Sequence, residues 1–170
     1  MREVVVAENR CLDCEVRTRS VCASLSIEDL ALLDAVAKRR CFLPGATIVT
    51  RGQPGQGVSI VLSGMARLYR QWPDRQRRIV SFVLPGEFVD PALGSEAPFS
   101  ADAIGTVTVC SLPRPVFMDL ADSRPQMMQQ LHAATMRAMR MAQDQVLLLG
   151  RHSAQERLVS FLLDMRSRLS

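Results

Sequence analysis

Residues 58–64 read Val58-Ser59-Ile60-Val61-Leu62-Ser63-Gly64, and this short apolar run ending in glycine predicts the architecture of the chain around it. Side chains alternate between the two faces of a strand, so Val58, Ile60 and Leu62 share one face. Turn signals recur roughly every ten residues around this run, at Pro44-Gly45, Gly52 to Gly57, Gly64, Pro73-Asp74 and Pro85-Gly86. Short strands at this spacing predict a mainly β protein, an antiparallel double-stranded β-roll of the jelly-roll type.

Helices are expected on both sides of the roll. Ser26 can cap a helix with Asp29 in the position of a capping box, and Ile27, Leu30, Leu33 (or Leu32) and Val36 then form its apolar stripe. Asp122 or Ser123 can cap a second, long helix that has Pro125 in its first turn and ends at Leu149-Gly150. Ser153 to Glu156 forms another capping box, which starts a last amphipathic segment.

The long helix carries two apolar stripes, and one would suffice to dock it on the roll. The second stripe follows an unbroken four-three alternation, which indicates a two-fold coiled coil with a sister chain. Because this seam includes a threonine, an alanine and a histidine, we expect a weak homodimer whose association can be switched. The predicted interface residues are Met128, His132, Thr135, Met139, Ala142, Val146 and Leu149. Burial of the helix in a larger core is the alternative.

These patterns divide the chain into four parts. Residues 1–25 form a cysteine-rich arm, 26–118 a helix plus the sensory β-roll, 122–150 a dimerisation helix, and 153–170 a hinge helix. Since no element follows the last helix for it to pack against, we expect the chain to be one module of a larger protein.

Composition and charge exclude several classes of protein. Lysine and arginine exceed aspartate and glutamate by 21 to 17, which is too small an excess to argue for nucleic acid. The arginines of the hairpin 65–78 are interpreted as a solvated tip, because only Tyr69 and Trp72 offer stacking. A dedicated nucleic-acid surface is the alternative. No apolar run approaches the roughly 20 residues that span a membrane. With no export signal, the expected compartment is the cytoplasm, where thiols stay reduced.

Three of the five cysteines, Cys11, Cys14 and Cys22, crowd into the N-terminal arm. Their thiolates could be soft metal ligands, and both zinc and iron–sulfur clusters accept such spacing. Zinc normally requires a second compact pair of ligands, whereas His132 and His152 stand singly. An iron–sulfur cluster tolerates a remote fourth ligand, because each iron takes only one protein sulfur. The spacing therefore favours a cluster over zinc, with inert thiols as a third reading.

Strand parity selects the fourth ligand. In residues 106–112, Val107 and Val109 share one face while Cys110 lies on the other. If the valines face the core, Cys110 faces outward, where the arm could fold over it. Cys41 lies next to Phe42 and is interpreted as a buried free thiol.

Taken together, these motifs resemble the sensory half of the CRP/FNR family of bacterial transcription regulators. The resemblance covers essentially the whole chain, and the Cys-x2-Cys-x7-Cys spacing is similar to that of FnrN/FnrL-type members. It is carried by Cys11 to Cys14 with Cys22, by 60–64, 84–89, 109–113 and 143–149, and by Glu156-Arg157-Leu158 with Phe161-Leu162.

This resemblance implies an oxygen sensor. It implies a 4Fe-4S cluster held under anaerobic conditions by Cys11, Cys14, Cys22 and Cys110, and a homodimer that binds DNA and acts with RNA polymerase. Oxygen would destroy the cluster, weaken the dimer and end this control. The DNA and RNA polymerase contacts would belong to the full-length protein, because the helix-turn-helix of the family is absent from these residues.

The chain departs from the cyclic-nucleotide branch of the family, which needs a glutamate for ribose and an Arg-Ser pair for phosphate. Glu87 is present, but the corresponding stretch reads Phe99-Ser100-Ala101-Asp102, and Asp102 would repel an anion. We therefore expect no cyclic nucleotide. An enzyme of the cupin kind would need histidines on the roll, and the predicted strands have none. The runner-up is a cluster-free or zinc-stabilised CRP-like effector or interaction domain.

Overall fold

The computed structural model describes residues 3–5, 11–54, 57–72, 76–90, 96–151 and 153–169. The chain forms two compact units, Met1–Met128 and Gln129–Ser170. The predicted turn at Pro73-Asp74, the middle of the turn 52–57, Arg75 and His152 lie outside the described residues.

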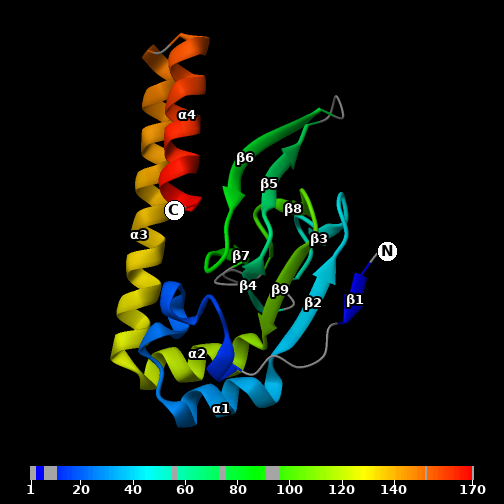
Figure 1. Ribbon diagram of the computed structural model, residues 1–170, viewed down its shortest axis with the longest axis vertical. Coiled ribbons are helices and arrows are strands. Elements are labelled where there is room, and N and C mark those ends of the chain that lie inside the picture. Colours follow the sequence, from blue (N-terminus) through cyan, green and yellow to red (C-terminus); the bar gives the residue numbers. More distant parts are fainter. Residues whose placement is uncertain are drawn as a thin grey trace. The chain divides into compact units, whose positions relative to one another are not determined.

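Two antiparallel sheets make up the first unit (Figure 1), so the predicted β-roll is confirmed. The five-stranded sheet has the order β1 (Glu3–Val5), β2 (Lys38–Phe42), β9 (Val107–Leu112), β4 (Val58–Ser63) and β7 (Phe88–Asp90). The four-stranded sheet has the order β3 (Thr47–Val49), β8 (Ser100–Ala103), β5 (Ala66–Gln71) and β6 (Arg77–Val83).

The core of the roll is built from one face of each sheet. Val61 on β4 is fully buried there together with Val107 and Val109 on β9. The opposite face of β4 is also buried, since Ile60 is only 3% exposed. Strand β4 is therefore covered on both sides, and its second face contributes to the cavity described below.

Glycine is required at the turn between β6 and β7. Gly86 has a φ of 93°, and a Cβ added there would lie 3.0 Å from the carbonyl oxygen of Arg19. Only glycine adopts this left-handed conformation at no steric cost. The close approach shows that the N-terminal arm packs against this turn of the roll.

The arm itself forms three short 3-10 helices, η1 (Cys11–Asp13), η2 (Arg17–Arg19) and η3 (Val21–Ser24). Val16 and Val21 anchor the arm, because both are almost completely buried. The thiols are thus presented by a packed segment, although the arm has a polar composition.

Helix α1 (Ile27–Val36) starts with the predicted capping box. The backbone N–H of Asp29 donates to Ser26 Oγ at 3.1 Å, and that of Ser26 donates to Asp29 Oδ2 at 3.3 Å. Leu30 and Leu33 are buried, so Leu33 rather than Leu32 belongs to the stripe. The inclusion of Ile27 was wrong: it is 70% exposed, since at about 100° per residue it lies roughly 90° from the centre of the Leu30–Leu33 face.

Helix α2 (Arg114–Ser123) was not predicted. It begins directly after β9, with Pro113 as N-cap and a second proline in its first turn. Its Phe117 is fully buried and meets Phe88 edge to face, with ring centroids 6.3 Å apart. This helix carries the chain from the roll to the start of the long helix.

The long helix α3 (Pro125–Arg151) has the predicted extent, and α4 (Ala154–Leu169) turns back antiparallel to it (Figure 1). The capping box of α4 is present, since Ser153 N–H donates to Glu156 Oε2 at 2.7 Å and Glu156 N–H donates to Ser153 Oγ at 3.3 Å. Within the described part of the chain, no helix has the length and apolarity to cross a membrane.

Candidate metal centre

The structure brings four cysteines to one small cavity in the first unit. Three come from the arm and one from β9, and the walls between them are mostly aliphatic. The cavity has a volume of about 30 Å³. Its lining residues are Cys11, Cys14, Val16, Arg17, Ser20, Cys22, Leu30, Leu33, Arg39, Ile60, Leu62, Cys110 and Leu112.

Local structure places each of these thiols. Cys11 opens η1, and Cys14 directly follows that helix. Cys22 lies in η3, where its backbone N–H donates to the oxygen of the N-cap Ser20 at 3.3 Å. Cys110 lies on β9 on the face opposite the core valines and is 8% exposed. The parity argument therefore placed Cys110 correctly beneath the arm.

Cys41 is separate from this group. It lies on β2 opposite Thr108 of β9 and is not among the residues that line the cavity. Its thiol is free, as predicted, but it is half-buried rather than buried.

Burial and a nearby arginine have opposite effects on the pKa of Cys11 and of Cys110. Burial raises the pKa of Cys110 to about 12, and the Arg39 charge opposes that rise. Burial and a hydrogen bond with Asp34 likewise raise the pKa of Cys11 to about 12, again opposed by Arg39. Burial raises the pKa of Cys22 as well. A metal that binds these groups must therefore displace their protons, because only the thiolate is a ligand.

A single ion and a cluster make different demands on this geometry. Four sulfurs on one zinc ion stand about 3.8 Å apart, since each Zn–S bond is about 2.3 Å. Among the described residues, no three His, Cys, Asp or Glu side chains are arranged to hold one metal ion. A four-iron core spreads its ligands over separate irons. The structure lines one cavity with four cysteines, which is a donor set that either a cluster or a zinc ion uses.

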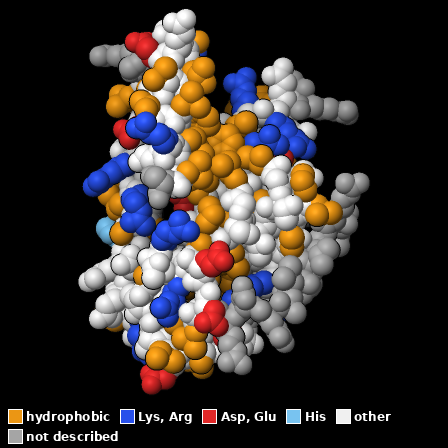
Figure 2. Space-filling view, in the orientation of Figure 1, with side chains coloured by type: hydrophobic (Ala, Val, Ile, Leu, Met, Phe, Trp, Pro, Cys, Tyr) orange, Lys and Arg blue, Asp and Glu red, His pale blue; other side chains and the backbone are white. Residues whose placement is uncertain are grey.

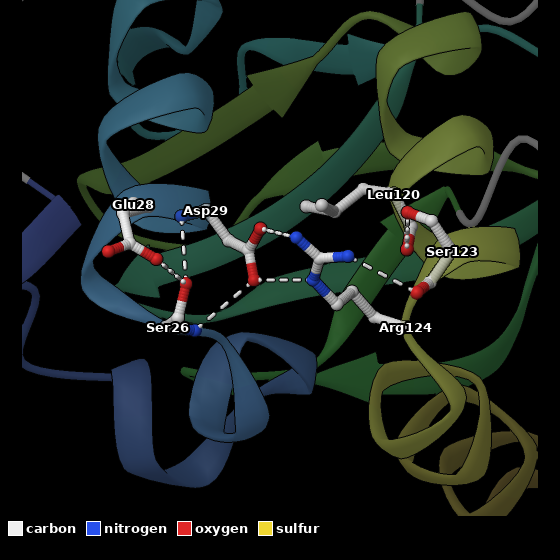
Figure 3. A network of polar contacts seen from close by, with 6 residues as sticks. All are labelled: Ser26, Glu28, Asp29, Leu120, Ser123 and Arg124. Atoms are coloured by element: carbon white, nitrogen blue, oxygen red, sulfur yellow. Dashed lines mark hydrogen bonds and ion pairs between the residues drawn. The ribbon is translucent and has the colours of Figure 1, made fainter.

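Two polar contacts tie the arm to the beginning of α3. The backbone N–H of Cys11 donates to Asp34 Oδ1 of α1 at 2.8 Å. At the other end of α1, Asp29 accepts from Arg124 Nη2 at 2.7 Å and from Arg124 Nε at 2.9 Å (Figure 3). This ion pair holds the pKa of Asp29 below its usual range, and Arg124 immediately precedes the first residue of α3.

The predicted dimer stripe of α3 is exposed along its whole length. Met139 is 46% exposed, and Val146 and Leu149 are each 69% exposed. The neighbouring stripe is more covered, with Leu131 buried and Met141 half-buried. Apolar side chains are visible on the surface of both helices of the second unit (Figure 2). All seven predicted interface residues are exposed, namely Met128, His132, Thr135, Met139, Ala142, Val146 and Leu149.

Asp102 was expected to repel cyclic nucleotides, and its surroundings differ from that expectation. Asp102 is 1% exposed and accepts from Arg67 Nε at 2.9 Å and Arg67 Nη2 at 2.8 Å. It also accepts from Arg77 Nη1 at 3.1 Å. Asp102 is therefore not a bare negative charge, and it keeps two arginines engaged within the roll. Glu87 in turn accepts from the backbone N–H of Leu84 at 2.9 Å.

The aromatic residues of the hairpin are occupied by arginines of the same hairpin. The guanidinium of Arg77 lies 4.7 Å from the ring centroid of Tyr69, and those of Arg70 and Arg78 lie 5.8 Å and 5.1 Å from that of Trp72. These cation–π contacts support the interpretation of a solvated tip.

Sequence reasoning missed Arg39, Asp34 and Arg124. Arg39 lies opposite Cys110 because of the register between β2 and β9, and a register between strands far apart in the chain cannot be inferred from one sequence. Asp29 and Arg124 are 95 residues apart, so only the fold reveals their pairing. Asp34 is the exception: its place on the side of α1 next to Leu30 could have been inferred from helical spacing.

Comparisons with known proteins agree with this fold. A family model described as the cyclic nucleotide-binding domain matches residues 39–124. The nitrogen fixation regulation protein FixK of Bradyrhizobium diazoefficiens is 39% identical over 94% of this chain and 67% of its own length. The transcriptional activator protein FnrL of Cereibacter sphaeroides is 30% identical over 95% of this chain and 65% of its own.

Solved structures give the same result. FixK2 from Bradyrhizobium japonicum superimposes with a TM-score of 0.74 at 32% identity, covering 79% of this chain and 68% of that one. The protein is thus a regulator with a domain of the cyclic-nucleotide-binding type. The chain belongs to the CRP/FNR family of transcription regulators, and its relatives are regulators rather than enzymes. It spans about two thirds of the length of the curated relatives it matches.

Proposed function

We propose that this chain is the sensory and dimerisation part of an oxygen-responsive transcription regulator. In this proposal Cys11, Cys14, Cys22 and Cys110 hold a 4Fe-4S cluster under anaerobic conditions. The single observation that carries the proposal is that these four thiols, and not Cys41, line one cavity. A bound cluster would supply the reactivity toward oxygen, since such clusters are oxidised and lost when oxygen reaches them.

Contacts within the chain couple the cysteine site to the dimerisation helix α3. A cluster bound by these cysteines would join the arm to β9, because three of its ligands come from the arm and one from β9. The arm is hydrogen-bonded to Asp34 of α1, and Asp29 of α1 is hydrogen-bonded to Arg124, which immediately precedes α3. A change in the arm can therefore bias how α3 is held, and a weak seam converts a small bias into association.

The partners follow from this scheme. We propose a homodimer formed through the exposed stripe of α3. DNA and RNA polymerase are then partners of the full-length protein, acting through its DNA-reading part. Cyclic nucleotides are not ligands in this proposal, because Arg67 and Arg77 are already engaged by Asp102.

Anaerobic purification of the full-length protein tests the proposal. We expect a brown protein with about four iron and four sulfide per chain, which loses its colour in air. A colourless protein with one zinc, or with no metal, would instead support the zinc-stabilised or cluster-free effector domain and would refute the oxygen sensor.

A further inference from the structure

The guanidinium of Arg39 has an unusual place beside the cysteine cavity. Arg39 lies directly opposite Cys110 in the pairing of β2 with β9. It lines the cavity together with all four cysteines. Its Nε atom is buried and has no hydrogen-bond partner among the described residues. A buried N–H donor without an acceptor is destabilising, so its position calls for an acceptor.

Arg39 borders the same cavity as sulfurs from both of its walls. Cys11 comes from the arm and Cys110 from β9, and both line the cavity together with Arg39. Arg39 is therefore close to both parts of the chain that a cluster would join.

We infer that Arg39 is a positioning residue. It holds the cluster by its charge and by an Nε–H donor. The inference rests on the proposed function. Four thiolates on a core of charge +2 make an anion of about −2, and burying such an anion is costly without a nearby cation. Asp34, which accepts from the backbone N–H of Cys11, adds negative charge rather than relieving it. Two arginines, Arg17 and Arg39, line the cavity. Arg39 supplies such a cation opposite Cys110 and, through Nε, a donor to sulfur.

Three variants of the full-length protein separate this role from a structural one. Arg39→Gln removes the charge, Arg39→Lys keeps the charge but removes the Nε donor, and Arg40→Gln is the matched control. Arg40 is the next residue on β2, but it contacts Phe42 and Ser111 and does not line the cavity. Each variant is reconstituted anaerobically, and circular dichroism checks that it folds.

Two measurements are made: the rate of iron loss to a chelator and the midpoint reduction potential. For Arg39→Gln we expect iron loss about tenfold faster or more, as for other outer-shell partners of a metal site. Its potential should fall, because the reduced cluster carries one more negative charge. Arg39→Lys should keep the potential of the wild type while losing iron faster, and Arg40→Gln should match the wild type in both.

The outcomes are distinguishable. If the wild type binds no cluster, the proposed function fails. If the wild type is loaded and Arg39→Gln matches it in both measurements, the inference about Arg39 is wrong. The inference also fails if Arg39→Gln loses iron faster with an unchanged potential, since that result indicates a structural role. If Arg39→Gln does not fold, Arg39→Lys decides: iron loss at the wild-type rate overturns the role of the Nε donor.

Discussion

Cys110 and Cys41 lie on neighbouring strands of one sheet, yet the structure gives them different surroundings. Cys110 faces the arm, whereas Cys41 pairs with Thr108 and lies outside the cavity. We therefore expect Cys110→Ser to abolish cluster binding and Cys41→Ser to leave it intact. Iron and acid-labile sulfide per chain, measured after anaerobic reconstitution, check this expectation. Loss of iron in Cys41→Ser with retention in Cys110→Ser would overturn the choice of ligands.

Asp29 provides a second prediction at the residue scale, because its carboxylate serves both the cap of α1 and Arg124. We expect Asp29→Asn to lower the free energy of unfolding more than Ser26→Ala, which removes only a cap and should cost about 1 kcal/mol. The pKa of Asp29 lies below its usual value near 3.8. Its stabilisation is therefore present at neutral pH, begins to decline as the pH falls below about 4 and is lost as the pH falls through the lower pKa of the folded state.

Urea unfolding at pH 7 and at pH 3 checks this linkage. The difference in stability between wild type and Asp29→Asn should be large at pH 7 and should shrink at pH 3, because below about pH 3.8 the carboxyl takes up a proton on unfolding. A difference that is the same at both pH values would mean that the charge of Asp29 contributes nothing.

At the scale of single elements, the sequence predicts what depends on local pattern. Alternation placed Val109 in the core and Cys110 beneath the arm, and the capping boxes at Ser26 and Ser153 start helices as predicted. The predicted turn at Pro85-Gly86 is present, and Gly86 has a positive φ there. These features need only neighbouring residues, which is why one sequence suffices for them.

Features that depend on distant residues were not predictable. The register that brings Arg39 opposite Cys110 is fixed by the whole sheet. Helix α2 was missed because its signal is short and follows directly on β9, so that the strand pattern hides its start. The burial of Val16 in the arm was also missed, because it depends on tertiary packing rather than on the polar composition of that segment.

The exposed stripe of α3 yields the prediction for this element. A carboxylate introduced at Ala142 would face its symmetry mate in a two-fold seam, where like charges repel and lose hydration. We expect Ala142→Glu to weaken the dimer at least tenfold, measured as the dissociation constant of anaerobic full-length protein by sedimentation equilibrium. Gln129→Glu is the control, since Gln129 is exposed on the same helix about 100° from the seam. Equal weakening by both variants would argue against a seam on this face.

At the scale of the whole molecule, contacts of the arm must supply enough free energy to shift the dimer equilibrium of the α3 seam. A tenfold change in the dimer dissociation constant corresponds to about 1.4 kcal/mol, which is about the strength of one hydrogen bond to a charged group. The contacts of Asp34 with Cys11 and of Asp29 with Arg124 are of this kind. A marginal seam can therefore be switched by rearranging few contacts, whereas a strongly apolar seam would stay closed whatever the arm did.

The last prediction concerns the association state itself. Under the proposed function, anaerobic full-length protein with its cluster should sediment mainly as a dimer at micromolar concentration, and brief exposure to air should shift it toward monomer as the iron is lost. Asp29→Asn should narrow this shift, because the bond between α1 and the start of α3 is weakened while the cysteines remain. Iron analysis of each fraction ties the mass to the cluster. Equal mass before and after air, with complete iron loss, would show that the seam of α3 does not respond to the arm.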